Sequence, residues 1–305
     1  MPHPWSLKYL RLWIITKLLR AFLRFQKWRV PLPPYNNPKI IRTEQAISSR
    51  DSGRSIRARW YRPASVASDQ VLPVLINVHG SGYVIPMFGQ DEPFCEMVAE
   101  RAQCLVIDAD YRKAPEYPFP LPSEDIEDVA LYVVARIPHS TLSLSGWSAG
   151  GNLALGVAAL LGPERVRSLV LFYPATSNKD RDGIPPESRM DSGSPIPPWM
   201  LHHFYDSYIV PGTPLANQRL SPDLTPTNRL PPHVWAVTGT ADPLYPAAAA
   251  LMARLQRDGH PDAVFRSLPY AGHGFVRGLN PAKPPDPRSE EVYDEAVAFF
   301  CKSIE

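Results

Sequence analysis

A serine between glycines is the strongest chemical signal in the sequence. Ser148 stands at the centre of Gly146-Trp147-Ser148-Ala149-Gly150, which follows an apolar segment expected to be a strand and precedes a run of small residues expected to be a helix. In that context the chain must turn sharply, and glycines two residues to either side let the backbone pass closely. Such a turn lifts the serine oxygen above a sheet, so we predict that Ser148 is a nucleophile.

A serine hydroxyl needs an adjacent base, and the base needs an acid that orients it. His273 lies in Ala-Gly-His-Gly-Phe directly after a predicted strand, where flanking glycines leave the imidazole room to face a cleft. Asp242 follows another predicted strand and precedes a proline, which favours extended backbone geometry. Asp223 and Asp262 fit less well because neither lies just past the carboxyl end of a strand. The order Ser148, Asp242, His273 is that of the α/β-hydrolases.

Attack on a carbonyl carbon creates an oxyanion, which backbone amides must stabilise. The segment His79-Gly80-Ser81-Gly82 follows a predicted strand and is placed to supply them, with the amide of Ala149 completing the set. A glycine pair after a strand could instead begin a dinucleotide-binding loop. No helix opens there, however, and the sixth position is Ile85. The sequence therefore disfavours a nucleotide, and it predicts no cofactor.

Strands and helices alternate from residue 55 onwards. Alternation predicts an α/β fold with a mostly parallel central sheet and helices on both faces, and the active site of such a sheet lies beyond the carboxyl ends of its strands. Residues 177–232 interrupt the pattern, with one helix expected near 198–209. The predicted strands are 56–61, 74–78, 104–109, 142–147, 168–172, 234–239 and 263–268, and the predicted helices are 92–101, 123–136, 149–161, 245–258 and 289–302.

The N-terminal segment is basic and apolar at once. Residues 1–30 contain no acid, although the formal net charge of the whole chain is only +2. At 100° per residue one arc of a helix over residues 6–28 is apolar and the opposite arc is basic. The apolar arc could lie on a membrane surface or against the body of the protein, and we favour the second, with the basic face in solvent. The apolar arc consists of Leu7, Ile14, Leu18, Phe22 and Phe25, and the basic one of Lys17, Arg20, Arg24 and Lys27.

Together these motifs resemble the hormone-sensitive-lipase-like branch of the α/β-hydrolases, a family of carboxylesterases and lipases. The resemblance covers residues 55–305 and implies the α/β-hydrolase fold. It implies Ser148 as nucleophile, His273 as general base and then acid, and Asp242 as its orienter. It assigns the oxyanion hole to the amides of Ser81, Gly82 and Ala149. The motifs that carry it are His79-Gly-Ser-Gly82, Asp110-Tyr-Arg-Lys-Ala-Pro-Glu116, Gly146-Trp-Ser-Ala-Gly-Gly151, Asp242-Pro-Leu and His273-Gly-Phe.

In this family N-terminal helices and a segment after the nucleophile's helix form a cap over the site. By that resemblance residues 1–45 are an N-terminal cap segment, 46–177 and 217–305 are the catalytic core, and 178–216 are a cap insertion. The insertion is rich in aromatic residues, which favours a hydrophobic substrate. The side chains expected to line its site are Tyr83, Trp199, His203, Tyr208 and Phe275.

Two positions depart from the family's pattern. Ser81 replaces a third glycine, so its β-carbon is expected to crowd the acyl side and to favour a short, acetyl-type acyl group. Trp147 replaces an aspartate and is expected to pack under the turn.

Arg112 and Glu116 are expected to form an ion pair that holds their loop. The motifs also resemble those of fungal esterases of secondary metabolism, including versiconal hemiacetal acetate esterases.

The sequence thus predicts a serine esterase that forms an acyl-enzyme from a hydrophobic small-molecule ester. An acyltransferase or cyclase with the same Ser-His-Asp site is one alternative, because the residues do not decide between water and another acceptor. A non-catalytic small-ligand receptor on the same fold is the other. The gibberellin receptor resembles this family but lacks the histidine, so the presence of His273 disfavours that alternative.

Composition and charge exclude several other classes. Thirty-six prolines among 305 residues rule out long helical bundles and repeat solenoids. The basic excess is confined to the N-terminal segment, which disfavours nucleic acid as a partner. Cys95, Cys104 and Cys301 show no paired spacing, which argues against a disulfide framework and a zinc site, and no metal is expected. Between residues 6 and 28 the longest uncharged run, residues 12–16, is too short for a signal peptide or a membrane span. We expect a cytoplasmic monomer or homodimer.

Overall fold

The computed structural model describes residues 6–29, 37–179, 184–276 and 285–305. Within these ranges the chain forms an eight-stranded sheet in the order β1-β2-β4-β3-β5-β6-β7-β8. Strand β2 runs antiparallel to both of its neighbours, and the other pairs are parallel. The mostly parallel sheet is therefore confirmed. The strands are β1 (Ile40–Ser48), β2 (Ser55–Pro63), β3 (Leu72–Val78), β4 (Leu105–Ala109), β5 (His139–Trp147), β6 (Ser168–Phe172), β7 (His233–Gly239) and β8 (Asp262–Leu268).

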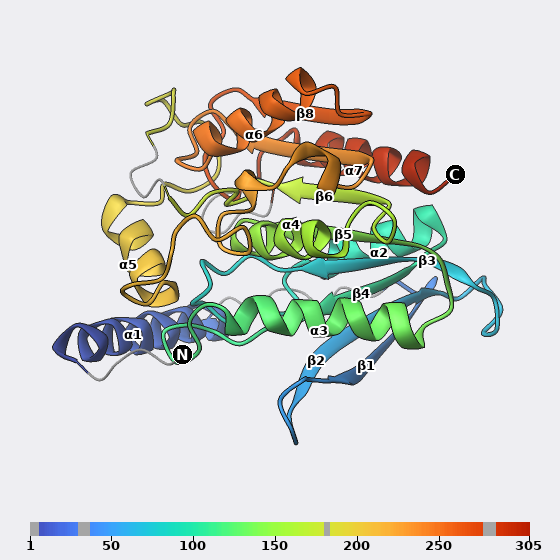
Figure 1. Cartoon of the computed structure of the whole chain (residues 1–305), viewed down its shortest axis with the longest axis horizontal. Helices are drawn as coiled ribbons and strands as arrows, with labels where there is room; N and C mark the ends of the chain where they lie inside the picture. Colours follow the sequence, from blue (N-terminus) through green and yellow to red (C-terminus); the bar gives the residue numbers. More distant parts are fainter. Residues whose placement is uncertain (1–5, 30–36, 180–183, 277–284) are drawn as a thin grey trace.

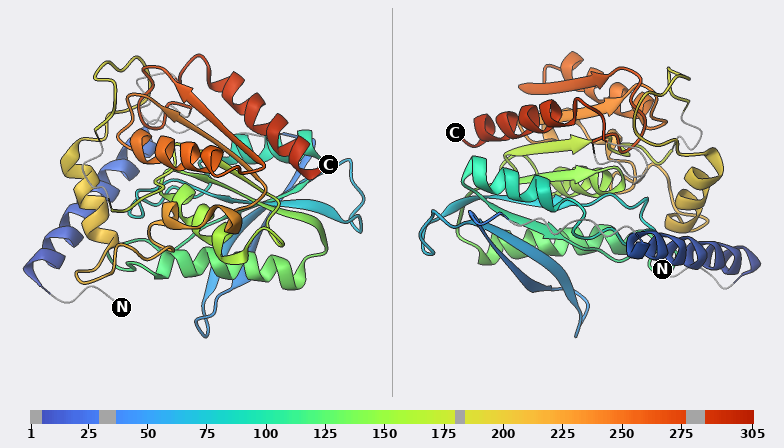
Figure 2. Two further views of the ribbon diagram at one scale, coloured as in Figure 1. Left: turned by 45° about the horizontal axis from the view of Figure 1, so that its top comes forward. Right: turned by 180° about the vertical axis from the view of Figure 1, so that it is seen from behind.

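Helices cover both faces of the sheet, as Figures 1 and 2 show. Helices α3, α4 and α6 bury apolar side chains against one face, and α2 and α7 bury theirs against the other, so each face carries its own hydrophobic core. The expected α/β-hydrolase architecture is confirmed. These helices are α2 (Glu92–Ala102), α3 (Leu121–Arg136), α4 (Ala149–Leu161), α6 (Tyr245–Arg257) and α7 (Ser289–Ile304).

Strand β1 was not predicted, and its sequence explains why. Only Ile40 and Ile47 are buried, because β1 is an edge strand whose other side chains face solvent. It therefore lacks the continuous apolar run of the central parallel strands, such as β6, which is buried on both faces. Because β1 pairs with β2 along its whole length, the sheet begins ahead of residue 45, the expected end of the N-terminal segment.

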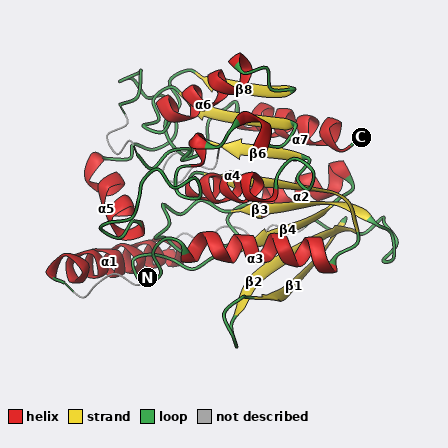
Figure 3. Ribbon diagram, viewed as in Figure 1, coloured by secondary structure: helices red, strands yellow, loops and turns green. Residues whose placement is uncertain are grey.

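The carboxyl ends of the parallel strands open onto one edge of the sheet, and helices α1 (Leu7–Arg29) and α5 (Pro198–Tyr208) lie beyond that edge (Figure 3). The predictions of these two helices are confirmed. A buried hydrogen bond of 3.0 Å joins Thr16 Oγ1 of α1 to His203 Nε2 of α5. The chain thus places its two outlying helices together over the edge at which active sites of such sheets form.

The orientation predicted for α1 is wrong. The arc expected to pack on the body faces solvent: Leu7 is 87% exposed, Leu18 66% and Phe22 55%. A second apolar stripe, which includes Leu12 and Leu19, packs inwards instead. The helix is apolar on two sides, so the position of its strongest arc alone could not show which side the body would cover.

Basic residues of α1 also point inwards. Arg20 donates to the carbonyl oxygens of Val84 (3.0 Å) and Ala114 (2.8 Å) and forms an ion pair with Glu116 (2.9 Å), while Lys17 also binds Glu116 (2.9 Å). The basic face therefore does not simply point to solvent. Arg20 satisfies two carbonyl oxygens of these loops, and this requirement fixes the rotation of the helix.

Candidate active site

Ser148 lies in a strained turn between β5 and α4. Its backbone angles are φ 53° and ψ −120°, a region that residues other than glycine rarely occupy. The Ser148 amide donates to the carbonyl of Phe172 at 2.9 Å, which holds the turn against β6. A β-carbon at Gly150 would overlap the carbonyl oxygen of Val78, and one at Gly146 would lie 2.5 Å from the carbonyl oxygen of Gly150. Glycine at both positions is therefore a steric requirement of the turn.

The structure brings Ser148, His273 and Asp242 together in one hydrogen-bonded series. Ser148 Oγ lies 2.9 Å from His273 Nε2, and His273 Nδ1 lies 2.8 Å from Asp242 Oδ2. A carboxylate can only accept, so Nδ1 carries the imidazole proton and Nε2 is left to accept from the serine hydroxyl. Asp242 is fully buried, and its second oxygen accepts from the amide of Leu244 at 2.9 Å.

The loop that bears His273 is held by the inserted segment, which the sequence did not reveal. The amide of Gly272 donates to the carbonyl of Ser192 at 2.9 Å, and the amide of Ser194 donates to the carbonyl of His273 at 2.8 Å. On the other side, the Tyr173 ring meets the imidazole edge to face, with centroids 4.8 Å apart. The imidazole is thus positioned by both the core and the insertion.

In the three peptides whose amides are expected to form the oxyanion hole, the carbonyl oxygen is held by a hydrogen bond. In a trans peptide the N–H points opposite to the C=O, so a bond to the carbonyl also aims the amide. His79 Nδ1 donates to Gly80 O at 3.0 Å, which sets the direction of the Ser81 amide. The amide of Ile85 donates to Ser81 O at 2.9 Å, which sets that of Gly82.

The third peptide follows the same rule. The amide of Ala175 donates to Ser148 O at 3.0 Å, and the amide of Asn152 donates to the same oxygen at 3.3 Å. The Ala149 amide is thereby aimed away from that oxygen, at the first turn of α4, where the helix dipole favours negative charge. Three donors suited to a developing oxyanion therefore have their directions fixed by the fold.

Tyr111 supports this segment, and sequence reasoning gave it no role. Its hydroxyl donates to the carbonyl oxygen of His79 at 2.8 Å, and its ring stacks on the His79 imidazole with centroids 4.6 Å apart. Because the phenol has one proton, Ser81 Oγ must donate to Tyr111 Oη, 2.6 Å away. Burial, with the charge of Lys113, lowers the pKa of His79, whose Nδ1 faces Gly80 O and whose Nε2 lies 3.1 Å from Asp110 Oδ1.

A buried polar cluster lies beneath the turn. Asn77 donates to Asp108 (2.9 Å) and Asp91 (3.1 Å), and its side-chain oxygen accepts from Ser145 (2.9 Å) and from the Trp147 indole (3.0 Å). Burial and then the neighbouring Asp91 raise the pKa of Asp108 to about 7.

Trp147 is fully buried and stacks on Phe172, with centroids 3.8 Å apart, so it packs under the turn as expected.

The prediction of an ion pair between Arg112 and Glu116 is wrong. Arg112 binds Asp51 (2.6 Å) and Asp125 (2.8 Å), whereas Glu116 binds residues of α1. The four-residue spacing could not show this, because the acids that fit Arg112 come from other segments.

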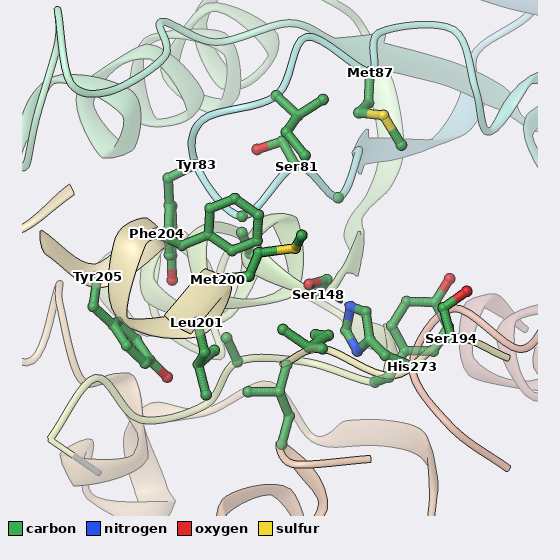
Figure 4. Close-up of a pocket in the computed structure, with 18 of the residues that line it drawn as sticks. Ser81, Tyr83, Met87, Ser148, Ser194, Met200, Leu201, Phe204, Tyr205 and His273 are labelled. Carbon is green, nitrogen blue, oxygen red and sulfur yellow. Dashed lines mark hydrogen bonds between the residues drawn. The ribbon is translucent and has the colours of Figure 1, made fainter. Parts of the chain in front are cut away.

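An apolar cavity of about 270 Å³ opens above Ser148 and His273 (Figure 4). Ser81 and Tyr83 line its core side. The insertion lines the other side through apolar side chains of α5 and of the segment before it. Those residues are Ile196, Met200, Leu201, Phe204 and Tyr205.

Of the five side chains expected to line the site, only Tyr83 belongs to the walls of this cavity. Trp199 is 59% exposed on the outer side of α5. His203 turns towards Thr16 of α1, and Tyr208 stacks behind Tyr83 with centroids 3.8 Å apart. Phe275 is fully buried beside Tyr173. The structure corrects these four expectations: the sequence identified the aromatic segment, but the rotation of α5 presents Phe204 to the cavity instead.

Comparison with known proteins agrees with this geometry. A family model described as the alpha/beta hydrolase fold matches residues 75–277. The chain is 28% identical over 244 residues to an ethyl acetate hydrolase of Pseudomonas putida, covering 77% of this chain and 76% of that protein. It is 33% identical over 126 residues to the versiconal hemiacetal acetate esterase of Aspergillus parasiticus, covering 40% of each.

Among solved structures, an alpha/beta hydrolase from the metagenome of Lake Arreo, Spain, superposes with a TM-score of 0.78 at 25% identity. The superposition covers 94% of this chain and 89% of that one. The likeness therefore extends well beyond the residues around Ser148, over most of both chains.

Proposed function

The chain belongs to the α/β-hydrolase family, in its hormone-sensitive-lipase-like branch, and from that premise we propose that it is a serine esterase. It cleaves carboxylic esters of small hydrophobic molecules through an acyl-enzyme. The observation that carries the proposal is the hydrogen-bonded series from Ser148 through His273 to Asp242, with the serine and the histidine in the wall of an apolar cavity.

The geometry suits a two-step reaction. Ser148 Oγ attacks the ester carbonyl carbon while His273 Nε2 takes its proton, and Asp242 stabilises the imidazolium through the 2.8 Å hydrogen bond to Nδ1. The tetrahedral intermediate collapses as the imidazolium gives its proton to the departing alcohol oxygen. Water then attacks the acyl-enzyme with His273 as base, which releases the acid and restores Ser148.

The oxyanion of both tetrahedral intermediates is proposed to bind the amides of Ser81, Gly82 and Ala149. Their directions are set before substrate arrives, because the carbonyls of Gly80, Ser81 and Ser148 are already hydrogen-bonded. Donors that need no reorientation during the reaction stabilise the transition state more than the ground state.

We propose a short, acetyl-type acyl group and an apolar alcohol part. A cavity of about 270 Å³ with mostly apolar walls supports a small ester, and two relatives are named for esters of acetic acid. The likeness to the Aspergillus enzyme over 40% of the chain further supports a substrate from secondary metabolism. Residues 1–45 and 178–216 are proposed as the cap, and 46–177 and 217–305 as the core.

Covalent labelling with a fluorophosphonate tests the mechanism. We expect the wild-type chain to be labelled, and Ser148→Ala to lose both labelling and about 10⁶-fold in kcat. Ser194→Ala is the matched control, because Ser194 lines the same cavity. Turnover that survives in Ser148→Ala would refute the mechanism, and a folded wild-type chain that neither labels nor turns over would indicate a ligand receptor.

A series of p-nitrophenyl esters tests the acyl preference. We expect kcat/KM to fall from acetate to longer acyl chains, and a preference for decanoate would contradict the short-acyl proposal. With an aliphatic acetate, one free acid should appear for each alcohol released. Transfer of the acyl group to an added alcohol in place of water would instead favour the acyltransferase alternative.

A further inference from the structure

One face of α1 presents apolar side chains to solvent. Leu10 (45% exposed), Ile14 (44%), Leu18 (66%) and Phe22 (55%) recur every four residues and so form a continuous stripe along the helix. Exposed large apolar residues scattered singly are ordinary, but a stripe of this kind on one helix indicates a surface that is covered in use.

The helix cannot turn this stripe inwards without losing its anchor. On the opposite face Thr16 is fully buried against His203, and Arg20 bonds Val84 O, Ala114 O and Glu116. These polar contacts would all be left unsatisfied if the helix rotated about its axis. The body of the same chain is therefore not what covers the stripe.

The charges of α1 indicate what kind of surface covers the apolar stripe. Arg11 is exposed within the apolar face, and Arg24 is exposed along one side of it. The helix contains no acidic residue. A second copy related by a two-fold axis would bring Arg11 and its neighbours against the same basic residues, with no acid on either helix to pair with them. An anionic surface has the complementary charge.

We propose that the outward face of α1 binds the surface of an anionic phospholipid membrane, with the helix lying in the plane of the surface. Apolar side chains would enter the boundary between headgroups and acyl chains, and Arg11 and Arg24 would meet lipid phosphates and carboxylates. None of the helices in the described ranges is long and apolar enough to cross a membrane. The contact is therefore peripheral, and it is independent of the proposed ester hydrolysis.

Co-sedimentation of the full-length chain with lipid vesicles tests the proposal. We expect binding to vesicles of phosphatidylcholine with 30 mol% phosphatidylserine, at least tenfold weaker binding to pure phosphatidylcholine, and release of the bound protein at high salt. Equal binding to both vesicle types, or to neither, would overturn the proposal.

The double variant Leu18→Glu with Phe22→Glu should abolish sedimentation. Its matched control is Leu131→Glu with Leu160→Glu, which places the same change at exposed sites on α3 and α4 (43% and 47% exposed) and should sediment like wild type. Loss of binding in the control as well would show that added negative charge, and not the α1 face, is responsible. Turnover of p-nitrophenyl acetate in both variants reports that they are folded.

Two further measurements distinguish a membrane surface from a second copy of the chain as the partner of the stripe. Arg11→Gln with Arg24→Gln should weaken vesicle binding about fivefold for each charge removed. Light scattering in solution should give the same molar mass for wild type and for Leu18→Glu with Phe22→Glu. A wild-type dimer that the variant converts to a monomer, without vesicle binding, would show that a second copy covers the stripe.

Discussion

The two walls of the cavity are built in different ways. The core wall, formed by the segments around Ser81 and Ser148, is held by bonds to backbone carbonyls and by glycines that leave no room for a side chain. The cap wall, formed by α5 and the segment before it, is held mainly by side chains, with Phe204 against Gly82 and Tyr208 against Tyr83. Backbone hydrogen bonds join it to the core only between Ser192 and Ser194 and the His273 loop, among the contacts described above.

The difference separates reactivity from selectivity. Backbone geometry fixes where charge is stabilised, so small displacements of the core wall should lower the rate for every ester. Side-chain packing fixes the volume and shape of the cavity, so substitutions in the cap wall should change which ester is preferred. Variants of each wall test this division.

Gly150→Ala should produce the largest effect. The new β-carbon would overlap the carbonyl oxygens of Val78 and His79, both next to the oxyanion segment. We expect kcat to fall at least about 100-fold and the unfolding free energy to fall by about 3 kcal/mol or more. Steady-state kinetics and urea unfolding measure the two quantities.

Gly156→Ala is the matched control in the same helix. There a β-carbon would lie 3.5 Å from its nearest neighbour, Arg219 O, which is an ordinary contact. We expect unchanged kcat and a gain of about 0.5–1 kcal/mol in stability. If Gly150→Ala changed kcat and stability no more than Gly156→Ala does, the core wall would tolerate displacement, and the proposed difference between the two walls would be wrong.

Asp108→Asn should change the pH dependence of stability. The pKa of Asp108 is raised to about 7 by burial and by Asp91, so between about pH 4 and pH 7 the folded chain keeps a proton that the unfolded chain has lost. Stability that is fully present below pH 4 is therefore lost as pH rises to about 7. The wild-type unfolding free energy should fall over this range by about 4 kcal/mol more than that of the variant.

Urea unfolding at several pH values measures this difference. Asp69→Asn, at an exposed loop position, should keep the wild-type slope. Parallel curves for wild type and Asp108→Asn would contradict the raised pKa. Such a result would also mean that protonation of Asp108, in the polar cluster under Trp147, does not stabilise the folded core wall.

Tyr111→Phe sharpens the comparison within the core wall. It removes the donor to His79 O and the acceptor for Ser81 Oγ while keeping the ring stacked on His79. We expect kcat to fall about 10- to 100-fold with little change in KM, because Tyr111 positions the amides without touching substrate.

Tyr117→Phe, on an exposed tyrosine of the same loop (47% exposed), should behave like wild type. The acyl-chain preference of Tyr111→Phe should also be unchanged. A change in preference, with kcat retained, would mean that Tyr111 shapes the cavity and does not set the direction of the amides.

Phe204→Ala should have the smallest effect on rate and the clearest effect on preference. Its ring covers Gly82 and lines the cavity, so its removal enlarges the space for substrate. We expect the ratio of kcat/KM for a bulky ester to that for ethyl acetate to rise about 5- to 10-fold. Trp199→Ala, on the exposed side of the same helix, should leave the ratio unchanged. An equal loss of kcat/KM for all esters in Phe204→Ala would mean that the cap wall, like the core wall, sets the rate and not the preference.

The same division explains what the sequence could predict. Ser148, Asp242 and His273 each follow the end of a strand, and the order of strands is readable from apolar runs, so the sequence could indicate that they meet. The glycines around Ser148 signalled close backbone passage before any contact was known. These features depend on local backbone geometry, which leaves a local trace in the sequence.

The cap wall left no such trace. Trp199 and Phe204 are both aromatic residues of one short helix, and only its rotation decides which of them faces the cavity. Likewise α1 has two apolar stripes, and the side that packs inwards was decided by Arg20 and Thr16, whose partners lie in distant segments. Contacts between residues far apart in the sequence cannot be inferred from periodicity alone.

The inward contacts of α1 also set an order on events during synthesis. The helix leaves the ribosome before the segments that bind it: Arg20 has no partner until Val84, 64 residues later, and Thr16 none until His203, 187 residues later. Throughout that interval a nascent segment with apolar side chains on two faces must remain soluble, which is the condition under which chaperones bind. An element made long before its partners is thus among the last that can dock.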